Sequence, residues 1–221
     1  MLNTDQPITD KTTRKPKNRW LSVIVHFIGV LPLVILGWAY LTQSLGFNPV
    51  ESVLRWTGRL GLIFLLLSLA GTPMRKIFRR PWMSRLRKPF GLYAAFYALL
   101  HFSTFAIWDY QLNLSQLWME IRSKPFILLG LAALIILGIL AATSFRETQR
   151  KLGRKWVWIH RLVYVSCVLV IAHYLLAVKG DLFSLQGAYT APLIALGLML
   201  LLFVVRIPAV FKFLKRLFST R

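Results

Sequence analysis

The sequence predicts an all-α integral membrane protein, a bundle of six transmembrane helices with both termini in the cytoplasm. Of its 221 residues 57% are hydrophobic, and the mean hydropathy is +0.59, which is too apolar for an ordinary soluble domain. Apolar runs of about 20 residues recur along the chain, and this is the length that a helix needs to cross a bilayer. Cations gather between these runs in an alternating pattern, which predicts the topology.

Six apolar runs follow one another, and each predicts one membrane-spanning helix. The second run is short because Arg55 and Arg59 interrupt its start and leave an amphipathic lead-in. No internal repeat or second domain is visible in the sequence. The predicted spans are residues 20–41, 60–73, 90–108, 125–142, 156–178 and 188–205.

The net charge of +21 would favour nucleic acid as the partner of a soluble protein. Here the cations flank membrane spans, where anionic lipid and the positive-inside rule account for them. The segments before the first span and after the second, fourth and sixth are rich in Lys and Arg, which predicts that both termini are cytoplasmic. We expect a disordered basic cytoplasmic tail at 1–19, a six-helix transmembrane domain at 20–206 and a short basic amphipathic cytoplasmic tail at 207–221.

The four histidines all fall inside predicted spans, and an ionisable ring inside a membrane marks a functional site. Counted along the helices, His101 and His173 lie roughly 12 and 9 Å below the periplasmic end, whereas His26 and His160 lie roughly 10 and 8 Å from the cytoplasmic side. Two imidazoles that face each other from different helices are the axial ligands of a bis-histidine heme. The sequence therefore predicts metal ligands at His101, His160 and His173, with His26 as a further cofactor-binding candidate.

Other interpretations of these rings stay open. A histidine near a helix end can instead hydrogen-bond a neighbouring helix or reach the interface, and for His26 this alternative carries equal weight. Zinc and non-heme iron are disfavoured, because no carboxylate lies inside a span and Cys167 is the only cysteine. The chain has no CxxCH sequence, so any heme would be held without a covalent thioether link.

Two arginines are further candidates for cofactor binding. Arg59 is expected at the level of His101 and His173, which would bind the upper heme, the one nearer the periplasm. There its guanidinium could pair with a propionate or a quinone oxygen. Arg75, together with Arg87 and Lys88, could serve a lower heme or a phosphorylated cofactor in the same way. The alternative for all of them is an interfacial cation that extends to lipid head groups.

Four motifs carry a family resemblance: TGR at 57–59, TPMR at 72–75, GLYAAFYALLH at 91–101 and QRKLGRKWVWIHRLVYVSCVLVIAHY at 149–174. They resemble the MsrQ (YedZ) family of heme-binding membrane subunits, within the ferric-reductase-like transmembrane superfamily. The resemblance implies a b-type cytochrome of the bacterial inner membrane, with one or two heme b groups and FMN. By position, His101, His160 and His173 match the family's heme histidines.

The same resemblance implies the partners. Electrons would come from the quinone pool or a cytoplasmic flavin reductase and pass to a periplasmic molybdopterin methionine-sulfoxide reductase (MsrP), which repairs oxidised envelope proteins. The chain would then be the electron-transfer subunit of an oxidoreductase complex rather than a stand-alone catalyst, so we predict no catalytic residue. Ferric reductases and NADPH oxidases carry two spaced histidines on each of two helices, whereas here Lys88 stands thirteen residues before His101. The alternatives are a transmembrane ferric reductase and a non-redox membrane transporter or assembly scaffold.

Overall fold

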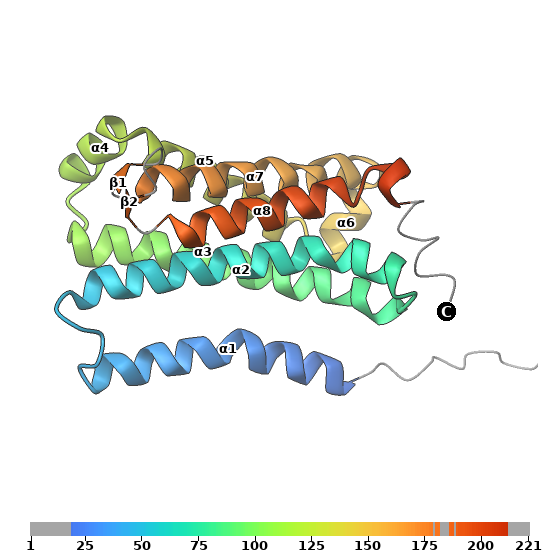
Figure 1. The fold of residues 1–221 in the computed structure, drawn as a ribbon, viewed down its shortest axis with the longest axis horizontal. Coiled ribbons are helices and arrows are strands. Elements are labelled where there is room, and N and C mark those ends of the chain that lie inside the picture. The colour runs from blue at the N-terminus through green and yellow to red at the C-terminus, as the bar shows by residue number, and fades with distance from the viewer. Residues whose placement is uncertain (1–18, 179, 182–185, 188, 212–221) are drawn as a thin grey trace, which may run out of the picture.

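The computed structural model describes residues 19–178, 180–181, 186–187 and 189–211. Over these residues the chain is a bundle whose long helices run along the length of the molecule (Figure 1). At one end of the bundle, two strands of two residues each, β1 (Gly180–Asp181) and β2 (Gln186–Gly187), pair antiparallel. The predicted disordered tail at 1–18 and the final residues 212–221 of the predicted amphipathic tail lie outside the described residues. The helices are α1 (Arg19–Leu41), α2 (Pro49–Ile77), the 3₁₀-helix η1 (Pro81–Leu86), α3 (Arg87–Thr104), the π-helix η2 (Phe105–Asp109), α4 (Leu114–Ser123), α5 (Pro125–Ala142), α6 (Arg146–Leu152), α7 (Lys155–Ala177) and α8 (Thr190–Val204).

Five helical segments of the described chain are long and apolar enough to cross a membrane: Trp20–Leu41, Pro49–Ile77, Pro81–Asp109, Pro125–Ala142 and Lys155–Ala177. The prediction of a helical, multi-pass membrane protein is therefore confirmed. The sixth predicted span is helical at α8, but its 15 residues rise only about 22 Å, less than the hydrocarbon core of roughly 30 Å. Six spans are not confirmed by the lengths of the helices.

The predicted start of the second span is wrong. Residues 60–73 belong to a single helix of 29 residues, α2, which begins at Pro49 and includes the lead-in. Asn48 caps this helix, because its side-chain oxygen accepts a hydrogen bond from the Glu51 amide at 3.1 Å. Arg55 does not break the helix, since it lies exposed on the surface with Glu51 at 3.3 Å.

Two short helices, α4 and α6, lie where the sequence indicated only loops. Helix α4 is amphipathic: Leu117 and Ile121 are buried against Ala106 and the aromatic residues around η2, while the opposite face is exposed. A search for long apolar runs does not detect a helix of this kind, because half of its surface is polar or faces outward.

The core lies where α2, α3 and α7 meet. Phe64 of α2 stacks on Tyr97 of α3 with ring centroids 5.4 Å apart, and Cys167 of α7 is fully buried in the same cluster. Helix α1 lies along the edge of the bundle (Figure 1) and is attached to α3, where the Tyr97 hydroxyl donates to the Gly29 carbonyl at 2.7 Å. Most of its apolar side chains are exposed, as expected of a lipid-facing helix.

Candidate functional site

The structure brings His101 of α3 and His173 of α7 together. Their ring centroids are 6.1 Å apart and the ring planes are nearly perpendicular, at 85°. Both side chains are partly buried, in the half of the bundle nearer α4. The depth argument from the sequence predicted this pair, and the two rings meet although α3 and α7 do not pack closely on each other.

A backbone carbonyl orients each ring. Nδ1 of His101 lies 2.9 Å from the carbonyl oxygen of Leu54 on α2, and Nδ1 of His173 lies 2.7 Å from that of Phe126 on α5. A carbonyl only accepts hydrogen bonds, so each Nδ1 carries the proton, and in the neutral ring Nε2 then holds the free lone pair. This is the arrangement typical of histidines that bind a metal.

Two glycines make room for these rings. A Cβ atom at Gly58 would lie 3.0 Å from Nδ1 of His101, and one at Gly130 would lie 2.8 Å from Nδ1 of His173. Any side chain at either position would therefore displace the ring from its carbonyl. This explains why a glycine stands in the TGR motif at 57–59.

The two helix pairs α2–α3 and α5–α7 present their histidines in the same way. Leu54 and Gly58 stand four residues apart on α2, as Phe126 and Gly130 do on α5. In both pairs the histidine follows the residue that supplies its carbonyl by 47 positions. The chain thus contains an internal structural repeat that the sequence alone did not reveal, because only a few widely spaced residues carry it.

The repeat also identifies the counterpart of His160. Lys88 precedes His101 by thirteen residues, as His160 precedes His173. The Lys88 ammonium donates to the Ser144 carbonyl at 2.7 Å and so links the start of α3 to the end of α5. The pair α2–α3 therefore has a lysine that links two helices at the position where the pair α5–α7 has His160.

The His101–His173 site fits a heme iron better than other metals. A metal–imidazole bond is about 2.0–2.1 Å, so two rings on opposite sides of one ion have centroids roughly 6 Å apart once the size of each ring is added. The described residues contain no cluster of three or more His, Cys, Asp or Glu side chains that could hold a metal ion. Zinc usually takes three or four protein ligands, whereas a heme needs only two axial ones.

The structure does not bring His26 and His160 together. The His26 ring is exposed and its Nδ1 lies 2.8 Å from the Tyr93 hydroxyl of α3. The His160 ring packs on Trp156 of its own helix, with centroids 4.1 Å apart, and its Nδ1 lies 3.3 Å from the Trp156 carbonyl. His26 thus links α1 to α3, whereas His160 keeps Nε2 available near the start of α7.

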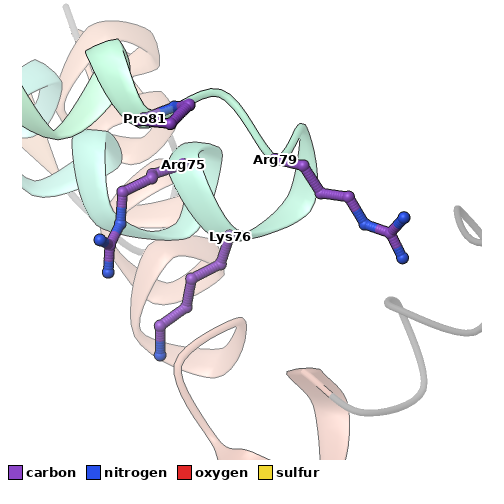
Figure 2. A pocket seen from close by; sticks show the side chains of 4 residues that line it. All are labelled: Arg75, Lys76, Arg79 and Pro81. Carbon is purple, nitrogen blue, oxygen red and sulfur yellow. The ribbon is translucent and has the colours of Figure 1, made fainter.

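The two candidate arginines lie at different ends of α2. Nε of Arg59 donates to the Tyr174 hydroxyl at 3.3 Å, which places Arg59 beside the upper histidine pair. Arg75 stands seventeen residues after Gly58, roughly 25 Å along the helix, and is therefore remote from that pair. It lines a shallow surface hollow of about 390 Å³ with Lys76, Arg79 and Pro81. Figure 2 shows Arg75 and Lys76 extending in one direction and Arg79 pointing away from both.

A third arginine, Arg206, was not among the residues singled out from the sequence. It lies just past α8, and its guanidinium is turned into the bundle, where Nη2 donates to the Leu69 carbonyl of α2. Its Cζ lies 5.0 Å from the ring centroid of Tyr164 on α7. No sequence signal indicates this inward position, because Arg206 begins a basic segment in which cations are expected on topological grounds.

Comparison with known proteins shows the family of the chain. The family model of the ferric reductase like transmembrane component matches residues 57–171, which include His101 and His160. A protein of Deinococcus radiodurans is 43% identical over 169 residues, 76% of this chain and 83% of the relative. One of Rhodospirillum rubrum is 39% identical over 205 residues (92% and 95%), and one of an Enterobacter species is 38% identical over 181 residues (81% and 89%).

Each of these relatives is a protein-methionine-sulfoxide reductase heme-binding subunit MsrQ. The matches extend over most of both chains, and the motifs at 57–59, 91–101 and 149–174 had indicated the same family. The chain therefore belongs to the MsrQ family of heme-binding subunits, within the ferric reductase like transmembrane proteins.

Proposed function

We propose that this chain is a b-type cytochrome of the bacterial inner membrane that relays electrons to a periplasmic methionine-sulfoxide reductase. The donor would be the quinone pool or a cytoplasmic flavin reductase, and the acceptor a molybdopterin enzyme of the MsrP type that repairs oxidised envelope proteins. The family of heme-binding subunits to which its relatives belong supports a role in methionine-sulfoxide reduction. FMN, a further cofactor of this proposal, is inferred from the family resemblance alone.

The pair His101–His173 is the observation that carries the proposal. These residues would hold a heme between α3 and α7, and the bound heme would supply one-electron redox chemistry. The carbonyls of Leu54 and Phe126 keep both rings in the tautomer that binds a metal through Nε2. Two imidazoles fill both axial positions, which suits electron transfer rather than the activation of oxygen.

Arg59 is the proposed electrostatic partner of this upper site. Its side chain is exposed and bonded to Tyr174, the neighbour of His173, so it lies where a propionate or a quinone oxygen could meet it. His160 is the proposed ligand of a second heme nearer the cytoplasm. Arg75 lies at the cytoplasmic end of α2, where it would bind a phosphorylated cofactor or lipid. His26 bonds to Tyr93, and we propose for it a link between helices before any contact with a cofactor.

The proposed topology has six spans and two cytoplasmic termini. Helix α1 begins and α8 ends at the same end of the bundle, α6 lies at that end as well, and α4 lies at the other (Figure 1). The cation-rich segments therefore gather at one end, as the positive-inside rule requires. The short α8 would complete a sixth span by drawing on the residues that follow it or by local thinning of the bilayer.

The first test is a reduced-minus-oxidised absorption spectrum of the purified protein, with heme quantified per chain. We expect a low-spin b-type spectrum that is nearly lost in His173→Ala and only partly lost in His160→Ala. A colourless wild type, expressed with ample heme supply, would favour the transporter or scaffold instead. Reduction of a ferric chelate faster than of the periplasmic enzyme would favour the ferric reductase.

A further inference from the structure

The guanidinium of Arg206 is the least satisfied polar group in the described part of the molecule. Nη2 donates to the Leu69 carbonyl, but Nε and Nη1 are buried and have no hydrogen-bond partner there. Buried donors are almost always paired, and one on a charged group is costly to leave unpaired. An acceptor that binds from outside the polypeptide would remove this cost.

No side chain around Arg206 supplies that acceptor. Its guanidinium lies against the Tyr164 ring, with Cζ 5.0 Å from the ring centroid. Among the described residues, the ion pairs are Arg55–Glu51 and Lys124–Glu120, both remote from α8 in the sequence. The positive charge of Arg206 is therefore not neutralised by a carboxylate of the described chain.

Arg206 lies against the helix that carries His160, α7. Tyr164 follows His160 by one helical turn, so both project from the same face of α7. Arg87 of α3 lies beside the same turn of α2 as Arg206, because Ser68 donates to the Arg87 carbonyl at 2.8 Å and the next residue, Leu69, accepts from Arg206. A ligand that reaches Nε2 of His160 would therefore meet Arg87 and Arg206. These two like charges repel each other, and an anion between them would be attracted to both.

We propose that Arg206 anchors a carboxylate of the cofactor held by His160, so that the end of α8 and the start of α7 bind one ligand together. This inference rests on the proposed function, since the carboxylate would be a heme propionate. A guanidinium binds a carboxylate through charge-assisted hydrogen bonds, and Nε and Nη1 of Arg206 are both left to donate one. A lipid phosphate offers the same oxygen chemistry, and the experiment below separates the two sources.

The test compares Arg206→Gln with Arg161→Gln, a matched control. Arg161 stands beside His160 in sequence, but its side chain is exposed and lies over the Trp158 ring at 4.4 Å. Heme per chain, reduced-minus-oxidised spectra and bound phospholipid by native mass spectrometry are measured for both and for His160→Ala. We expect Arg206→Gln to retain the cytoplasmic heme at least roughly tenfold more weakly, as His160→Ala does, and Arg161→Gln to match wild type.

The outcomes separate this inference from the function on which it rests. Wild-type heme content in Arg206→Gln, with loss of bound phospholipid, would make the ligand a lipid and overturn the inference. Wild-type heme content in both Arg206→Gln and His160→Ala would overturn it as well. In either case a His173→Ala protein without its main heme signal would leave the proposed function intact, whereas a His173→Ala protein with full heme would refute that function.

A second variant guards against a fold defect. Arg206→Met removes the charge and keeps much of the volume, so it should raise the melting temperature of heme-free protein, in which the guanidinium has no partner. In heme-loaded protein the same substitution should lower it, because the anchor is lost. A lower melting temperature in both forms would show that Arg206 is only a structural link to Leu69.

Discussion

At the level of single residues, glycine decides how closely each histidine can approach the neighbouring helix. The rings of His101 and His173 lie against Gly58 and Gly130, at distances where a Cβ atom would collide with Nδ1. The same closeness lets Nδ1 reach a helix carbonyl that would otherwise serve only its own helix. A methyl group at either glycine should therefore disturb a metal ligand without changing any ionisable group.

Gly130→Ala should shift or weaken the optical signal of the upper heme and destabilise the protein by about 1–3 kcal/mol, because the added methyl overfills a packed contact. The measurement is the reduced-minus-oxidised spectrum together with thermal unfolding. Gly138→Ala on the same helix is the control, since a Cβ there meets nothing within 4 Å. Equal spectra for the two variants would contradict the role assigned to Gly130.

Residue positions along a helix predict depth but not neighbours. The rise of about 1.5 Å per residue correctly placed His101 and His173 at one level, and the contacts of α3 with α5 and of α2 with α7 then brought the two rings together. The same calculation put His26 and His160 at one level, yet α1 contacts α3 and His26 bonds to Tyr93. Which helices adjoin depends on tertiary packing, and a single sequence does not encode it in a readable pattern.

At the level of elements, α4 has a packed face and an exposed face. Leu117 and Ile121 hold it on η2 and the start of α5, while Trp118 is 53% exposed with Arg122 beneath its ring at 4.4 Å. Glu120 is partly buried and bonds to Lys124, so its replacement would disturb the helix as well as its surface. Trp118 is therefore the cleaner probe of a docking surface for the periplasmic partner.

Trp118→Ala should slow electron transfer to the periplasmic reductase several-fold and leave the heme spectrum unchanged, because the side chain points away from the bundle. Stopped-flow oxidation of the reduced cytochrome by the partner enzyme measures this. The control is Trp158→Ala, an exposed tryptophan that pairs with Arg161 at the same 4.4 Å but lies at the other end of the bundle. Unchanged kinetics in Trp118→Ala would place the docking surface elsewhere.

The end of α4 should also respond to acid. The Lys124 ammonium, and then the Tyr110 hydroxyl, hold the pKa of the Glu120 carboxyl below its ordinary value of 4.5. The lowered pKa means that this interaction stabilises the folded loop fully above pH 4.5 and is lost as the pH falls through the folded value. The contribution is below about 1 kcal/mol, because water reaches the Glu120–Lys124 pair and screens it.

Hydrogen exchange of the α4 amides, corrected for intrinsic rates, checks this expectation. Protection should fall when the pH is lowered below 4.5 in wild type, whereas Glu120→Gln should show lower protection at all pH values and little further change. A wild type whose α4 protection does not depend on pH would mean that the Glu120 contacts do not hold the loop.

The accuracy of each predicted helix depends on the residues at its two ends. Helix α5 occupies 125–142 as predicted, because a proline opens it and Thr143 ends the apolar run. Helix α2 begins eleven residues before the predicted span, since its first turns carry Arg55 and Arg59 on the surface and a hydropathy pattern excludes them. The short α4 gave no apolar run at all. Its buried face only becomes evident once η2 and α5 are in place beside it.

At the level of the whole molecule, the topology is open to direct measurement. Cys167 is the only cysteine and is fully buried, so its replacement by Ser gives a background for single-cysteine reporters. We expect a reporter at Ser115 to react with an impermeant maleimide added from the periplasm, and a reporter at Arg150 to react only after the inner membrane is opened. Labelling of both from the periplasm would contradict the proposed orientation.

The paired hairpins have a consequence for how this site tolerates mutation. A side chain that orients a metal ligand can be lost through one base change, but every amino acid at 54 or 126 still provides a backbone carbonyl. The tautomer of each histidine is therefore protected against drift at the residue that sets it. Vulnerability is concentrated in the two glycines, where every replacement adds a Cβ, so purifying selection on ligand geometry should act there more strongly than on Leu54 and Phe126, whose carbonyls accept the hydrogen bonds.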